Sequence, residues 1–146
     1  MSKHAEADLI LKLYELRREE TMRKARDWYF REFHPQSMDD VTHAMFGEHS
    51  GHLRMVMSYW DMAAALVKHG AISMELFNDT NGEHFAVFAK LEKFVEAMRA
   101  QYGPQALVRL EELIDATPGG RERTAAVRER MKAMAAKFAE AAGAKQ

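Results

Sequence analysis

The stretch from Ser50 to Gly70, "SGHLRMVMSYWDMAAALVKHG", decides the fold class of this chain. A helix drawn through it carries apolar side chains on almost every side. Its polar side chains fall on one narrow stripe, formed by Arg54, Ser58, Asp61 and Lys68. Because a helix that is apolar nearly all round is buried, the stretch predicts a central buried helix near residues 50–69, ended by Gly70.

The segments on both sides of this stretch also favour helices. Good helix formers fill them, and no alternation of apolar and polar residues is long enough for a strand. A first helix is expected from about Asp8 to Phe33, either continuous or bent at "RREE", Arg17 to Glu20. Further helices are expected from Ser37 to Phe46, from Ser73 to Phe77, over Glu83 to Tyr102, around Leu107 to Ile114 and after Gly120.

Short connections between these segments place neighbouring helices antiparallel. We therefore predict an all-α, single-domain bundle of about five helices over residues 1–146, with a frayed end from about residue 142. A length of 146 residues suits one domain with one core.

Composition excludes several classes of function. The net charge of −1 gives the whole domain no drive toward nucleic acid or an anionic membrane. The absence of cysteine removes disulfides, thiolate catalysis and iron–sulfur clusters. The longest apolar run, Met62 to Val67, has six residues, whereas a membrane span needs about 20. Since the N-terminus does not resemble a secretory signal, we expect a soluble cytoplasmic protein.

Two stretches resemble a known group of proteins. Tyr59 to Phe77, "YWDMAAALVKHGAISMELF", carries an aromatic pair, an acid, an alanine-rich helix end and then Gly70 and Ile72. This pattern resembles a widespread group of small bacterial all-helical proteins of unknown function. Leu9 to Trp28 is similar to their N-terminal helix. The resemblance implies a helical fold and no particular activity.

The sharpest chemical hypothesis is a metal site at "GEHSGH", Gly47 to His52. His49 and His52 are spaced to share one face at the start of a helix, and His43 or Glu48 could supply a third ligand. The alternative is that these polar side chains serve the first turn of the buried helix, whose leading N–H groups need partners. No cofactor is predicted, and a divalent metal is the one ion that these residues suggest.

Asp61 is the candidate for a catalytic residue, because a carboxylate on a buried helix is paired or shifted in pKa, as functional acids often are. The alternative is that its polar stripe is the solvent edge of the helix or a structural pair.

Basic residues gather at the C-terminus. From Arg121 onward, seven Lys or Arg against three Glu give +4, which leaves −5 for residues 1–120. Such a helix could bind nucleic acid or an anionic surface. However, no aromatic residues lie among the basic ones, so we do not expect nucleic acid as a partner. The opposite charges could instead pair, within one molecule or between two.

Methionine is abundant, and it recurs at adaptable binding surfaces. The buried helix is apolar on more sides than a small bundle covers, so we expect a second copy to cover it, with Met55, Met57, Trp60 and Met62 at the interface. The first hypothesis is therefore a non-enzymatic interaction or structural module that forms a homodimer. The alternative is a metal- or small-ligand-binding enzyme that uses His43, His49 and His52.

Overall fold

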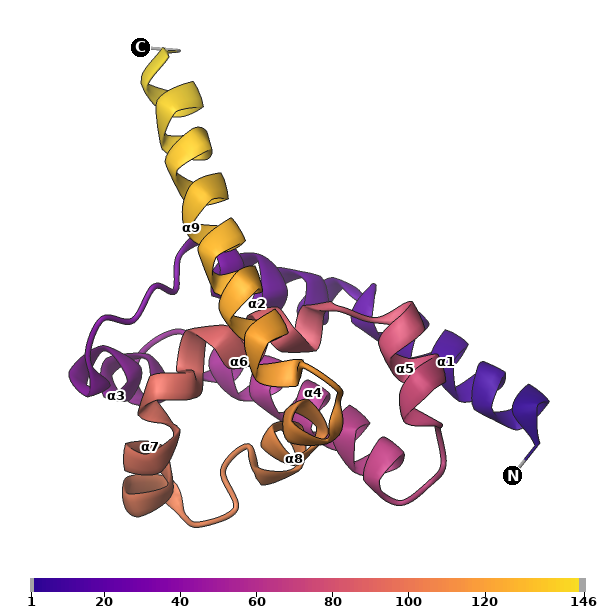
Figure 1. Cartoon of the computed structure of the whole chain (residues 1–146). Helices are drawn as coiled ribbons and strands as arrows, with labels where there is room; N and C mark the ends of the chain where they lie inside the picture. The colour runs from indigo at the N-terminus through magenta and orange to yellow at the C-terminus, as the bar shows by residue number, and fades with distance from the viewer. Residues whose placement is uncertain (1, 145–146) are drawn as a thin grey trace.

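The computed structural model describes residues 2–144, and over this range every regular element is a helix. The order along the chain, shown in Figure 1, is α1 (Lys3–Arg17), α2 (Glu20–Arg31), α3 (Met38–Phe46), α4 (Ser50–Lys68), α5 (Met74–Thr80), α6 (Glu83–Leu91), the 3-10 turn η1 (Glu92–Phe94), α7 (Val95–Tyr102), α8 (Val108–Ala116) and α9 (Gly120–Ala144). The all-α class is confirmed. The described residues form more and shorter helices than the roughly five that were expected.

The predicted buried helix, α4, is the centre of the fold. Both α2 and α8 pack along it, and α3 and α6 add smaller contacts. Its buried side chains include Leu53, Val56 and Trp60. The core therefore forms around the stretch that was richest in apolar residues.

The N-terminal segment is bent at "RREE" rather than continuous. The carboxylate of Glu19 accepts the backbone N–H of Met22 and starts α2. The backbone N–H groups of Thr21 and Met22 lower the pKa of Glu19. An extended backbone at Glu19 separates α1 from α2, and α1 extends away from the body toward the N-terminus (Figure 1).

Several helix starts lie where the sequence places them. Ser37 and Ser73 accept the N–H groups of Asp40 and Leu76 at 3.2 Å and begin α3 and α5. The expected helix over 83–102 is instead interrupted by η1. In a 3-10 turn, side chains three apart eclipse one another, so Leu91 and Phe94 both enter the core.

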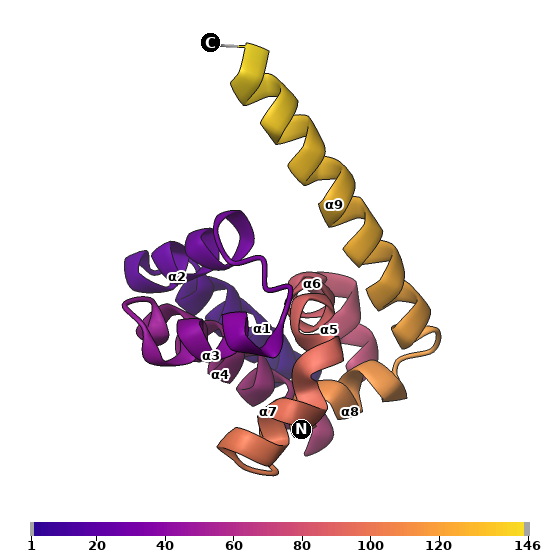
Figure 2. The same ribbon diagram turned by 90° about the vertical axis from the view of Figure 1, so that its left-hand side faces the viewer.

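The junction between α8 and α9 requires glycine. A Cβ at Gly120 would lie 1.8 Å from the carbonyl oxygen of Ile114, and Gly119 has φ +66°. This tight turn sends α9 back across the body, where its first half packs on α6 and α8. Its outer half then projects away from the other helices, as Figures 1 and 2 show. The helix continues to Ala144, and the remainder of the expected frayed end, 145–146, lies outside the described residues.

No helix within residues 2–144 is both long and apolar enough to span a membrane.

Candidate functional site

The structure brings two of the candidate histidines together. The rings of His49 and His52 are stacked with centroids 5.9 Å apart. Both lie against Trp28 of α2, at 5.2 and 6.0 Å. His49 precedes α4 and makes no capping hydrogen bond with its side chain. The pair therefore packs as part of the contact between α2 and α4.

The other two candidates do not complete a ligand set. Glu48 is 88% exposed, and its carboxylate lies 3.6 Å from Nε2 of His49. Nowhere in residues 2–144 do three or more His, Asp or Glu side chains form a group that could hold a metal ion. Metal binding by His43, Glu48, His49 and His52 has no support from this geometry and stays a prediction.

Asp61 joins α4 to α8. Its carboxylate accepts hydrogen bonds from Nε–H of Arg109 at 2.8 Å and from the backbone N–H of Leu110 at 2.9 Å. Leu107, which precedes α8, has φ 54° and offers no side-chain cap. Asp61 thus caps α8 from a different helix, where the exposed N–H groups and the helix dipole favour a negative charge. A catalytic role for Asp61 stays a prediction.

The polar stripe of α4 is therefore not simply a solvent edge. Two helical turns beyond Asp61, Nζ of Lys68 lies 3.0 Å from the carboxylate of Glu112 in α8. Two charged side chains of the stripe thus bridge to the same helix. Arg54, nearer the start of α4, bonds to Ser50 within its own helix.

Glu83 forms a second polar junction that the sequence did not reveal. Its carboxylate accepts two N–H groups of Arg26, at 2.7 and 2.9 Å, and Nε1–H of Trp60 at 3.2 Å. These contacts tie α2, α4 and α6 together. The pKa of Tyr29 is raised mainly by burial and further by the nearby charge of Glu83. Burial also raises the pKa of Tyr59 to about 12. Since each partner comes from a different helix, no local motif could have indicated the junction.

Of the four expected interface residues, Trp60 belongs to the interior. It is 1% exposed, so this fold leaves it almost no surface to offer a partner, and its place at an interface stays a prediction without support from the geometry. Its ring packs against Phe77 of α5 and His84 of α6, and its Nε1–H donates to Glu83, so these two helices cover it. Met55 and Met57 pack partly against the core. Met62 is 47% exposed.

A groove of about 1400 Å³ lies between the end of α2, one side of α6 and the outer half of α9. Phe30 and Pro35 line one wall. Met131, Met134 and Phe138 line the other. This groove presents apolar side chains from both walls to a space that no other part of residues 2–144 fills.

Lysine and arginine side chains stand among the apolar ones of this groove. Lys90 donates to the carbonyl oxygens of Tyr29 and Phe33 at 2.8 and 2.6 Å and to Nδ1 of His34 at 3.2 Å. It thereby caps the end of α2, where carbonyl groups lack helical partners. Burial lowers the pKa of Lys90 to about 8. Arg31, Lys93 and Lys132 also line the groove.

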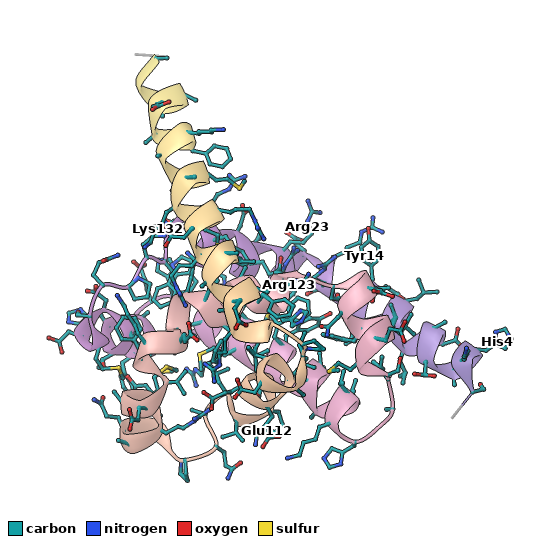
Figure 3. The ribbon with its side chains drawn as sticks, viewed as in Figure 1. His4, Tyr14, Arg23, Glu112, Arg123 and Lys132 are labelled. Carbon is teal, nitrogen blue, oxygen red and sulfur yellow. The ribbon has the colours of Figure 1, made fainter. Side chains whose placement is uncertain are left out.

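Exposed apolar side chains are concentrated on the two projecting helices. On α9, Met134 and Phe138 are 54% and 70% exposed. On α1, Leu11 and Tyr14 are 63% and 50% exposed. Figure 3 shows Tyr14 on α1 and Lys132 on the projecting part of α9, on separate parts of the molecule. The signal in the sequence was the heptad-like spacing of Val127, Met131, Met134 and Phe138, which fits a core helix equally well.

A protein-family model described as a domain of unknown function, DUF4760, matches residues 3–117. The match runs from α1 to the end of α8 and stops before α9. No curated protein and no solved structure matches the chain. The resemblance to small helical proteins of unknown function is confirmed, and the comparison assigns no activity.

Proposed function

The chain belongs to the DUF4760 family, a domain of unknown function, and we propose that this member is a non-enzymatic helical module that binds a second copy of itself. The observation that carries the proposal is the apolar side of α9 beyond the body. Val127 packs against the core, whereas Met134 and Phe138, further along the same side, are exposed. The side that binds α9 to its own body continues past the point where the body ends.

A projecting helix with exposed apolar side chains is less stable without a partner than with one. The packed first half of α9 supplies the helical nucleus, but most helical stability in proteins comes from tertiary packing, which the outer half lacks. This outer half runs from Met131 to Ala144. Packing against a partner would stabilise it and would remove its exposed apolar surface from water.

A second copy is the simplest partner, because it is present wherever the chain is and most soluble oligomers are built from identical subunits. The polar groups support an interaction role over a catalytic one. The carboxylates of Asp61 and Glu83 are both engaged in holding helices together. The bacterial, cytoplasmic setting expected from the sequence is part of this proposal.

Binding of nucleic acid by the basic C-terminal helix has less support. Arg121 pairs with Glu92, Glu111 and Asp115, and Arg128 pairs with Glu92. These arginines are thus neutralised within the molecule, which leaves less positive charge to release counterions from a phosphate backbone.

Sedimentation equilibrium of the full chain tests the proposal. We expect the wild-type chain to associate and the double variant Met134→Ser/Phe138→Ser to be monomeric at the same concentration, because the apolar contact is lost. Phe46→Ser is the matched control, since Phe46 is 75% exposed but lies on α3, away from α9. A wild-type chain that is monomeric over the whole accessible concentration range would refute the proposal.

A further inference from the structure

The apolar side of α9 has the repeat of a coiled coil. Val127, Met131, Met134, Phe138 and Ala141 follow one another at spacings of four, three, four and three. These are the core positions of a heptad repeat, which packs against a second helix. The positions that flank this seam in such a pair are Arg130 and Lys137 on one side and Arg128, Ala135 and Ala142 on the other.

This charge pattern disfavours the pairing of two α9 helices. Neither flank carries an acid, so Arg130 and Lys137 of one copy would meet only basic or neutral side chains of the other. Like charges placed together across an interface cost several kcal/mol. A partner helix with acids beside its apolar seam would pair with these basic side chains, which a second α9 does not do.

The exposed side of α1 has that composition. Ala7, Leu11 and Tyr14 lie four and three residues apart and are exposed, whereas Leu13 faces the core. Asp8 and Glu15 flank this seam, are exposed, and are seven residues apart, which is also the separation of Arg130 and Lys137. The two helices have matching repeats with opposite charges.

We infer that the outer half of α9 packs in parallel on α1 of a second copy, with Arg130 opposite Asp8 and Lys137 opposite Glu15. This inference rests on the proposed self-association and names the surface that carries it. In this register Phe138 meets Leu11, and Met134 meets Ala7. The long side chain of Met134 thus faces the small Ala7, which leaves room for it between the two helices.

The way each helix is attached to the body favours the parallel direction. α9 is attached at its N-terminal end, whereas α1 leads into the body at its C-terminal end and contacts it again near its start, where Glu6 accepts a hydrogen bond from the backbone N–H of Ser73. The start of α1 and the end of α9 lie on different sides of the molecule in Figure 1. Parallel pairing between two copies puts the two bodies at opposite ends of the paired segment. Antiparallel pairing would bring both bodies to the same end.

Charge reversal on each helix, followed by mixing, tests the inference. One variant carries Arg130→Glu/Lys137→Glu, and the other carries Asp8→Lys/Glu15→Lys. Each alone is expected to weaken self-association by about tenfold or more, because like charges then face each other. In an equimolar mixture every contact between the two variants joins opposite charges, so association is expected to return.

The controls are Lys12→Glu and Lys132→Glu, which reverse exposed charges off the paired flanks and are expected to change the dissociation constant by less than about twofold. Circular dichroism of each variant checks that the fold is kept. Variants that still associate alone, or a mixture that stays monomeric, would overturn the α1–α9 contact while the wild-type chain still associates. A monomeric wild-type chain would instead refute the proposed function itself.

Discussion

His84 is fully enclosed by the core, yet one of its ring nitrogens has no hydrogen-bond partner. Nε2 lies 3.1 Å from the side-chain oxygen of Asn78, to which it donates, whereas Nδ1 is unpaired. The ring packs against Trp60, Phe77 and Phe85. Burial first, and then the charge of Arg123, lower the pKa of His84 to about 3. The fold therefore holds this histidine neutral.

This burial predicts a loss of stability on mild acidification. In the unfolded chain the His84 side chain has a pKa of about 6.5. As the pH falls below that value, the unfolded state takes up a proton at His84 that the folded state excludes, so the free energy of unfolding decreases toward the folded pKa of about 3. In urea titrations at pH values from about 7 to about 5, His84→Gln is expected to show a smaller decrease than wild type.

This pH range isolates His84, because carboxylates change the free energy of unfolding only at lower pH. Glu19, Glu111 and Asp115 have lowered pKa values in the folded state, so their contribution is lost below about pH 4.5. His69→Gln, at an exposed position, serves as the control and should follow the wild-type curve. Parallel curves for wild type and His84→Gln would contradict the prediction.

At the scale of elements, two helix ends in this molecule are capped by side chains from other helices. Asp61 of α4 caps α8, and Lys90 of α6 caps the end of α2. Glu83 joins three helices through one carboxylate. Such contacts fix how short helices cross, which the propensities of their own residues do not determine.

The α4–α8 contact predicts unequal costs for two ion pairs. Asp61→Ala is expected to lower the free energy of unfolding by about 2 kcal/mol, because it removes hydrogen bonds to a charged group and leaves Leu110 N–H uncapped. Glu112→Ala removes the half-exposed pair with Lys68 and should cost less than about 1 kcal/mol. Chemical denaturation measures both, and equal costs would show that Asp61 does not cap α8.

At the scale of the molecule, the direction of α9 is set at its base. Arg121 donates to Glu92 of η1 and to Glu111 and Asp115 of α8, at 2.6 to 3.0 Å. These carboxylates raise the pKa of Arg121 further above its ordinary value. Together with the tight turn at Gly120, the cluster fixes the angle at which the outer half of α9 leaves the body.

Loss of this cluster should loosen α9 without unfolding the body. In hydrogen–deuterium exchange, Arg121→Ala is expected to speed exchange of backbone amides in 120–128, because its bonds to two other elements disappear. Lys132→Ala is the control, since its pair with Glu129 lies within α9 and is 68% exposed on the lysine side. Unchanged exchange in Arg121→Ala would show that apolar packing alone holds the base.

Much of the fold could be predicted because helix signals are local. The caps at Ser37 and Ser73 and the buried α4 follow from residues close in the chain. The interruption at η1 could not be predicted, because Leu91 and Phe94 adopt it to reach a core built from other helices. The candidate site was predicted less well: His49 and His52 do meet, but on Trp28, which is distant in sequence.

The sequence by itself determined the all-α class, the central helix and the apolar periodicity of each segment, because the helical repeat depends only on neighbouring residues. Only the tertiary structure decided which apolar sides are covered. Trp60 is covered by side chains of α5 and α6, whereas Phe138, on an equally periodic helix, extends past the body that would cover it. Burial depends on where distant segments cross, and periodicity carries no information about that.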